Sequence, residues 1–229
     1  SGFVENILSA QLADRYQTVA LDPRGVGTST PIWCMTDEER DADLAAVFDT
    51  DDMSTEELVD WYSQETKEFG EQCLERNGEI LGYVDSDSAT RDFDMARAVL
   101  GAKQIDYMGF SYGTVLGALY ADIFPSRVGN FLLDGAVDPA LSINEVSALQ
   151  LEGMEKALYH WIEECQANKS CPLTGDLESG KEQMIEFFEQ VDEQPIETAD
   201  PERPLNGGLA RTAVIGSLYN TQMYPLLTQ

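Results

Sequence analysis

The sequence has 229 residues, 43% of them hydrophobic, which is enough for one large packed domain or for one domain with a sizeable insertion. Its 42 acidic and 14 basic residues give a formal net charge of −28, which would repel nucleic acid phosphates and anionic lipids, so we expect no nucleic acid partner. No run approaches the ~20 apolar residues of a membrane span, and nothing resembles a signal peptide, although we expect residues to precede Ser1.

The first hundred residues predict one buried strand and four helices. The β-rich run from Tyr16 to Leu21 ends in the turn cluster Asp22-Pro23-Arg24-Gly25-Val26-Gly27, which is typical of a strand end. The expected helices cover about Val4 to Ala13, Asp37 to Phe48, Thr55 to Arg76 and Thr90 to Leu100. Thr36 and Ser54 begin capping boxes for the second and third of these helices, and Gly101 is the expected C′ residue of the fourth.

The segment from Ile105 to Leu133 predicts a strand, a sharp turn, a helix and a second strand. The turn holds a G-x-S-x-G motif, Gly109-Phe110-Ser111-Tyr112-Gly113, and apolar residues recur at helical spacing after it. Strand, helix and strand in this order favour a parallel sheet. A serine at such an elbow is held out of the sheet on strained backbone, which makes Ser111 our candidate nucleophile; the alternative is a purely structural glycine turn.

From about Leu141 onward we expect helices and no further strand. Ser142 begins a capping box for a long helix that reaches Cys165, and further helices are expected around Met184 to Val191 and Gly208 to Leu218. We interpret residues 141–229 as a helical cap over a core of residues 1–140. A separate binding domain is the alternative interpretation.

The acidity and the cysteines each allow two interpretations. The charge indicates either a solvated acidic surface or a field that attracts cationic substrates such as the α-ammonium group of a peptide.

The four cysteines, Cys34, Cys73, Cys165 and Cys171, form no C-x-x-C pair. Because the sequence also has one histidine, we expect no metal site and no cofactor. The cysteines predict either two disulfides in an extracytoplasmic protein or buried thiols in a cytosolic one.

Four segments together resemble the α/β-hydrolase fold, and within it the proline iminopeptidase and tripeptidyl aminopeptidase group of serine peptidases. They are the run from Leu21 to Ser29, the helix from Thr90 to Gly101, the elbow, and the run from Leu133 to Pro139. The resemblance implies an α/β fold with a doubly wound, mostly parallel sheet, present here in part, and a helical cap. Two further features resemble the secreted actinobacterial tripeptidyl aminopeptidases: the spacing of Cys34 from the Asp-Pro-Arg-Gly turn and the Cys171-Pro172-Leu173 segment of the cap. This resemblance implies a secreted or cell-surface protein.

The resemblance also implies site residues. Ser111 would be the nucleophile and the backbone N–H of Tyr112 one oxyanion donor, while Ser1-Gly2 resembles the end of the Gly-rich loop that supplies the second donor. The family's catalytic Asp and His follow the cap in chain order, so we expect both beyond Gln229, in a longer enzyme. We expect His160 at the surface, and Asp134 and Asp138 in turns rather than in a catalytic triad.

Three functions remain open from the sequence. The first is a serine exopeptidase that releases short peptides or single residues from free N-termini, with Glu145, Glu152 and Glu155 as candidates for holding the substrate ammonium group. The others are an esterase or lipase and a non-catalytic binding protein. The sequence gives no oligomeric state.

We predict the disulfides Cys34–Cys73 and Cys165–Cys171. Of the three pairings that four cysteines allow, this one alone keeps each bridge within the core excursion or within the cap. The other two pairings would tie the cap to the core and restrain a lid that must leave a route to Ser111.

Overall fold

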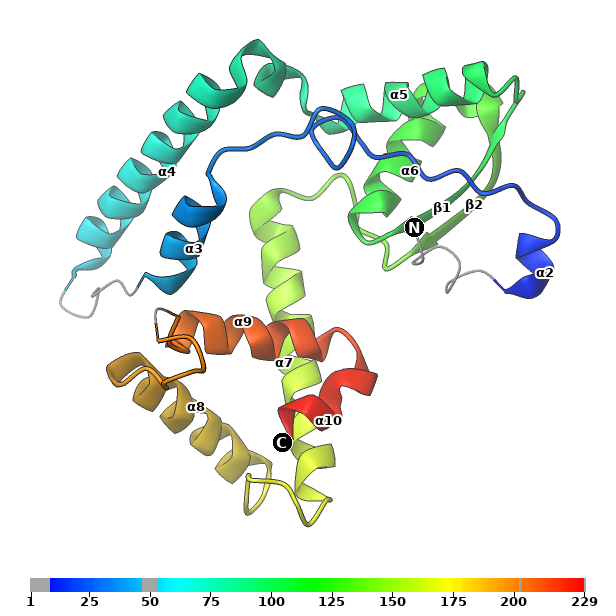
Figure 1. Ribbon diagram of the computed structural model, residues 1–229. Coiled ribbons are helices and arrows are strands. Elements are labelled where there is room, and N and C mark those ends of the chain that lie inside the picture. Colours follow the sequence, from blue (N-terminus) through cyan, green and yellow to red (C-terminus); the bar gives the residue numbers. More distant parts are fainter. Residues whose placement is uncertain (1–8, 47–52, 202, 229) are drawn as a thin grey trace. The chain divides into compact units, whose positions relative to one another are not determined.

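The computed structural model describes residues 9–46, 53–201 and 203–228, and the chain divides into two compact units (Figure 1). The first unit consists of Ser1–Cys34 and Gln72–Pro139, and the second of Met35–Glu71 and Ala140–Gln229. The elements of the first unit are α2 (Ala10–Ala13), η1 (Gly78–Tyr83), α5 (Ser86–Val99), β1 (Ile105–Phe110), α6 (Tyr112–Ile123), η2 (Pro125–Arg127) and β2 (Val128–Asp134). Helix α4 (Thr55–Asn77) runs from the second unit into the first.

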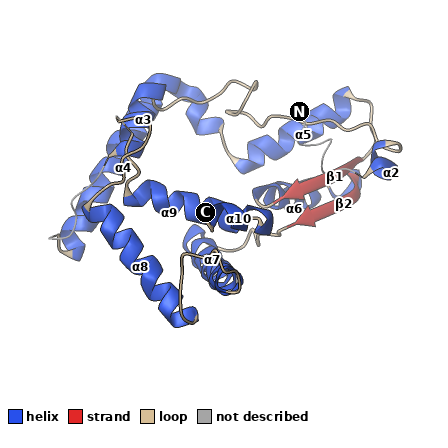
Figure 2. Ribbon diagram, turned by 60° about the horizontal axis from the view of Figure 1, so that its bottom comes forward, coloured by secondary structure: helices blue, strands red, loops and turns tan. Residues whose placement is uncertain are grey.

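The predicted strand–helix–strand segment forms the centre of the first unit. Strands β1 and β2 pair in parallel, with Gly109 opposite Leu133 and Phe110 opposite Asp134. Helix α6 connects the two strands and packs against both, as Figure 2 shows. An aromatic layer of Phe93, Tyr107, Phe131 and Tyr120 joins α5, the strands and α6, with neighbouring ring centroids 5.3–6.0 Å apart. These rings fix the helices over the sheet.

The predicted strand from Tyr16 to Leu21 is wrong for this structure. The segment has no regular secondary structure, and Val19 is 55% exposed. A strand is stable only where a neighbour satisfies its backbone groups. Among the described residues the sheet has two strands, β1 and β2, and this segment pairs with neither.

The predicted helix limits were partly right. The helix expected from Thr90 begins four residues earlier, at Ser86, because the Asp85 side chain accepts a hydrogen bond from the Ser88 N–H and caps it there. Gly101 follows the helix with φ +70°, which confirms it as the C′ residue. The helix expected from Val4 is described only from Ala10, since residues 1–8 lie outside the described part of the chain.

The turn after Leu21 is held by side chains. The Asp22 carboxylate accepts hydrogen bonds from the N–H and the hydroxyl of Thr28, which lower the pKa of Asp22. A side chain on Gly27 would collide with this carboxylate, because its Cβ would lie 2.4 Å from an Asp22 oxygen. Arg24 makes a bidentate ion pair with Asp92 on α5, with N–O distances of 2.7 and 2.8 Å. The turn is therefore anchored to the helix before the elbow.

Two disulfides link the predicted pairs, Cys34 with Cys73 and Cys165 with Cys171. Cys34 is the last residue before the chain enters the excursion Met35–Glu71 of the second unit, so its bridge closes the base of that excursion. The Asn77 side chain also holds the base of the excursion. It accepts a hydrogen bond from the Trp33 N–H and donates one to the Trp33 carbonyl, next to Cys34.

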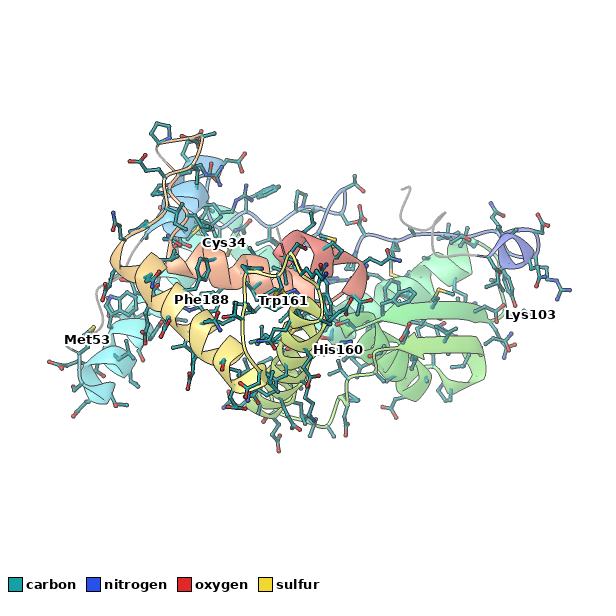
Figure 3. All side chains as sticks on the ribbon, turned by 90° about the horizontal axis from the view of Figure 1, so that it is seen from below. Cys34, Met53, Lys103, His160, Trp161 and Phe188 are labelled. Carbon is teal, nitrogen blue, oxygen red and sulfur yellow. A yellow bond between two sulfur atoms is a disulfide. The ribbon has the colours of Figure 1, made fainter. Side chains whose placement is uncertain are left out.

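The second unit is helical. Besides most of α4, it contains α3 (Asp37–Ala45), α7 (Ile143–Gln166), α8 (Leu177–Glu193), α9 (Gly207–Leu218), η3 (Thr221–Met223) and α10 (Tyr224–Leu227). The expected capping boxes are present at Thr36 and Ser142. Trp161 of α7 is 3% exposed and lies in a core of helix side chains against which Phe188 of α8 packs (Figure 3). Among the helices of the described residues, none combines the length and the apolar composition of a membrane-spanning segment.

The first unit contains a partly buried ion network around Asp94 of α5. The Asp94 side chain is 14% exposed and pairs with Arg97 at 2.8 Å and with Arg127 of η2. It also accepts a hydrogen bond from the hydroxyl of Tyr120, which is buried on α6. The bond from Arg97, followed by those from Tyr120 and Arg127, lowers the pKa of Asp94.

We predict that Asp94→Asn destabilises the protein by about 2 kcal/mol at pH 7, because two guanidinium groups lose their shared carboxylate. Since the pKa of Asp94 is lower in the folded state, this contribution is present above about pH 4 and is lost as the pH falls through the folded pKa. Urea unfolding of the intact protein should show a difference between wild type and variant that closes in acid.

Asp87→Asn is the matched control on the same helix, because Asp87 pairs with Arg91 in solvent, each side chain 56% exposed. It should leave the urea midpoint almost unchanged. Equal losses for the two variants would contradict the assignment of Asp94 as the centre of the network.

Candidate active site

Ser111 lies at the junction of β1 and α6 in a conformation that L-amino acids rarely adopt. Its φ is +50° and its ψ is −119°. Holding a non-glycine residue there costs about 1–3 kcal/mol, and the surrounding structure must offset that cost. Ser111 is exposed, and although it occupies the N-cap position of α6 its hydroxyl makes no capping hydrogen bond. The hydroxyl is thus not committed to the helix.

Close approach of the helix to the strand explains the first glycine of the motif. A Cβ on Gly109 would lie 2.5 Å from the Gly113 carbonyl oxygen and 2.7 Å from the Tyr107 ring. Gly113 itself has room for a methyl group, whose nearest neighbour would be the Tyr107 hydroxyl at 3.5 Å. Gly117 was not predicted from the sequence, and a Cβ there would lie 2.7 Å from Leu133 of β2. Glycine recurs at every fourth residue from Gly109 to Gly117, and this pattern could have predicted the close contact between α6 and the strands.

Backbone hydrogen bonds hold both sides of Ser111. Its N–H donates to the carbonyl of Asp134 at 2.9 Å, and its own carbonyl accepts from the N–H of Thr114 at 2.9 Å. Tyr107 contributes next to this point, since its hydroxyl donates to the Gly113 carbonyl at 2.7 Å. Burial raises the pKa of Tyr107, so the phenol stays protonated and can donate.

The N-terminus of α6 can stabilise negative charge next to Ser111. Tyr112 is the first residue of the helix, so its N–H has no acceptor within the helix, and the first turn carries no acidic residue. The side chain of Tyr112 is 56% exposed, and its hydroxyl is hydrogen-bonded to that of Ser86 on α5. The backbone N–H of Tyr112 therefore remains our candidate oxyanion donor. Ser1-Gly2, the candidate for the second donor, lies outside the described residues.

The remaining candidates have positions consistent with other roles. His160 projects from α7 with 63% of its side chain exposed, and its Nε2 lies 3.9 Å from Glu164. Asp134, expected in a turn, is instead the last residue of β2 and offers its backbone carbonyl to Ser111. Asp138 follows in the loop toward α7. Within the described residues, no group of three or more His, Cys, Asp and Glu side chains is arranged to hold a metal ion.

The three glutamates proposed as ammonium ligands have partners in α7 or at its N-cap. Glu145 accepts hydrogen bonds from the N–H and hydroxyl of Ser142, Glu152 pairs with Lys156 at 2.6 Å, and Glu155 accepts from the Tyr159 hydroxyl. The pKa values of Glu145 and Glu152 are lowered by these bonds. A substrate ammonium group would have to compete with the existing partners, so none of the three is favoured as the anchor.

Known proteins are similar to this chain over most of its length. The family described as the α/β hydrolase fold matches residues 2–213. A protein named serine protease Hip1 from Mycobacterium tuberculosis is 34% identical over 230 residues, which is 96% of this chain and 44% of that protein. A tripeptidyl aminopeptidase from Streptomyces lividans is 31% identical over 94% of this chain and 38% of its own length.

A third relative has a different name. A carboxylesterase B from Mycobacterium tuberculosis is 34% identical over 97% of this chain and 42% of its own length. The chain thus spans less than half of the length of these relatives. Similarity alone does not choose between peptide and ester substrates.

We predict that Gly109→Ala disrupts the elbow, because the added methyl group would meet helix backbone that cannot move without breaking the β1–α6 contact. The variant should lower the unfolding temperature and slow the reaction of Ser111 with a fluorophosphonate.

Gly153→Ala on α7 is the control, since its Cβ would have no neighbour within 4 Å. Alanine favours a helix over glycine by about 1 kcal/mol, so this variant should be neutral or slightly stabilising. Normal reactivity of Gly109→Ala would show that the helix can retreat from the strand.

Proposed function

The chain belongs to the α/β-hydrolase fold family, as the resemblance in its motifs predicted, and we propose that it carries the nucleophile of a serine hydrolase. The observation that carries the proposal is the conformation of Ser111, which is strained, exposed and placed between a strand and a helix N-terminus with a hydroxyl not used for capping. Such strain persists at functional sites because other contacts maintain it.

In the proposed reaction the Ser111 oxygen attacks the substrate carbonyl carbon while a base takes the hydroxyl proton. The Tyr112 N–H donates to the developing oxyanion. The leaving group then departs with a proton, and water hydrolyses the acyl-enzyme. We propose that the base is a histidine outside these 229 residues, because His160, the one histidine of the sequence, is exposed on α7 beside Glu164.

The favoured substrate is a peptide with a free N-terminus, from which the enzyme would release short peptides or single residues. The names of two relatives, a serine protease and a tripeptidyl aminopeptidase, support this choice. The charge supports it as well, because the second unit holds 29 of the 42 acidic residues and 7 of the 14 basic ones. A negative field raises the encounter rate of cationic substrates. Ester hydrolysis is the second candidate, supported by the relative named carboxylesterase.

We also propose an extracytoplasmic location and a cap. The disulfides Cys34–Cys73 and Cys165–Cys171 support the location, because such bridges persist mainly in oxidising compartments. We propose that residues 141–229 form the cap of a core built by residues 1–140, with Met35–Glu71 as a part of the core sequence that groups with the cap residues. The helices α7, α8, α9 and α10, which share one apolar core, support a cap that folds as a unit.

We predict that a fluorophosphonate probe labels Ser111 of the full-length protein, which by our proposal includes the catalytic histidine. Ser111→Ala should abolish both labelling and hydrolysis. Ser63→Ala is the control, since Ser63 is exposed on α4 and its hydroxyl only donates to the Val59 carbonyl in its own helix. Labelling that persists in Ser111→Ala would reject the assignment, and so would full hydrolytic activity of that variant.

We further predict that the full-length protein, assayed without the probe, cleaves tripeptidyl amides with a free N-terminus faster than N-blocked amides or short acyl esters. Comparing kcat/KM across the three substrates decides between the candidates. Turnover of esters without turnover of either amide would favour the esterase. Absence of turnover together with absence of labelling would favour a non-catalytic binding protein.

A further inference from the structure

Two backbone hydrogen bonds restrain Ser111, and its carbonyl oxygen has room for a third. Its N–H donates to Asp134, and its carbonyl accepts from the Thr114 N–H. A carbonyl oxygen has two acceptor sites, so one remains after that bond. At a residue with φ +50°, a further bond to this carbonyl opposes rotation of the peptide toward an ordinary turn.

The second acceptor site is filled by the hydroxyl of Thr114. The distance from Thr114 Oγ1 to the Ser111 carbonyl oxygen is 2.6 Å, and Thr114 is 1% exposed. The same hydroxyl accepts a hydrogen bond from the N–H of Val137 at 3.0 Å. Because the Val137 N–H can only donate, the single hydroxyl proton points to Ser111, and the direction of the chain of bonds is fixed.

This chain of bonds closes a ring around the elbow. Asp134 is the last residue of β2 and Val137 belongs to the loop that follows it. The Asp134 carbonyl accepts from the N–H of Ser111, while the Val137 N–H is joined to the Ser111 carbonyl through Thr114. The loop turns at Gly135, whose φ is +67° and where a Cβ would lie 3.7 Å from the Ser111 nitrogen. Ser111 is therefore held on one side by the end of β2 and on the other by the loop after it, and Thr114 is the one side chain in that ring.

We propose that Thr114 is a positioning residue, whose hydroxyl keeps Ser111 in its reactive conformation by joining the Ser111 carbonyl to the loop after β2. The proposal rests on the proposed role of Ser111 as nucleophile. Thr114 does not touch the substrate in this role. It acts on the rate of the chemical step through the orientation of Ser111 and of the N–H of Tyr112, the next residue.

A suitable control exists in the neighbouring helix. Thr90 of α5 is 0% exposed, and its hydroxyl donates to the carbonyl of Ser86 at 2.7 Å. It is thus an equally buried threonine with a hydrogen bond to a carbonyl, but the bond lies within its own helix. Replacing Thr90 by Val tests what the loss of such a hydroxyl does to stability alone.

The experiment compares Thr114→Val, Thr114→Ser and Thr90→Val in the intact protein. Fluorophosphonate labelling rates and peptide or ester kinetics are measured below the unfolding temperature of the least stable variant. Thr114→Val should slow labelling and lower kcat by roughly ten- to a hundredfold with KM little changed, because a small misplacement of a nucleophile has effects of this size. Thr114→Ser retains the hydroxyl and should recover most of the rate, and Thr90→Val should label at the wild-type rate.

Two results would overturn the proposal: labelling of Thr114→Val at the wild-type rate, or equal slowing of Thr114→Val and Thr114→Ser. If Thr114→Val does not fold, Thr114→Ala carries the same comparison with Thr114→Ser, because it also removes the hydroxyl. Failure of the proposed function is recognised separately, since the unmodified protein would then not be labelled at Ser111.

Discussion

The structure of the first unit depends on one constraint, the close approach of α6 to β1 around a serine with positive φ. Gly109 permits the approach, because any side chain there would meet the Gly113 carbonyl. The pairing of Phe110 with Asp134 then brings the end of β2 beside Ser111, where the Asp134 carbonyl accepts the Ser111 N–H. Each such bond contributes about 1 kcal/mol, so a few of them offset a strain of about 1–3 kcal/mol. The register of the sheet and the strain at Ser111 are therefore parts of one arrangement.

The surroundings of the elbow make this arrangement rigid. Tyr107 packs between Phe93 and Phe131, and its hydroxyl reaches the first turn of α6, so one side chain links a helix, a strand pair and the elbow. Asp94, the residue after Phe93 on α5, is bound by Arg127 of η2 and by the Tyr120 hydroxyl of α6. The Tyr107 hydroxyl and the Asp94 carboxylate are both partly buried, and both have hydrogen-bond partners. Such satisfied polar groups favour a single packing arrangement over several similar ones.

The sequence could predict features that depend on neighbours along the chain. The G-x-S-x-G motif, the capping box at Ser142 and the C′ glycine at Gly101 are local patterns with a local physical cause. The strand expected from Tyr16 failed because strand propensity is realised only with a pairing partner. Thr114 was missed for a related reason: as a helix residue it looks ordinary, and its role exists only because Val137 lies 3.0 Å from its hydroxyl. Sequence spacing does not contain that contact.

Charge and elbow belong to different parts of the chain and act over different ranges. The first unit has 13 acidic and 7 basic residues, whereas the second has 29 acidic and 7 basic ones. Attraction of a cationic peptide to an acidic surface raises the rate at which the two meet. At moderate salt this attraction is screened over about 8–10 Å, so the rate falls as salt is added. The bonds of Thr114 are buried and only 2.6–3.0 Å long, so salt screens them much less. If Ser111 is the nucleophile that we propose and its substrate is a cationic peptide, added salt should change the rate of encounter more than the reactivity of Ser111.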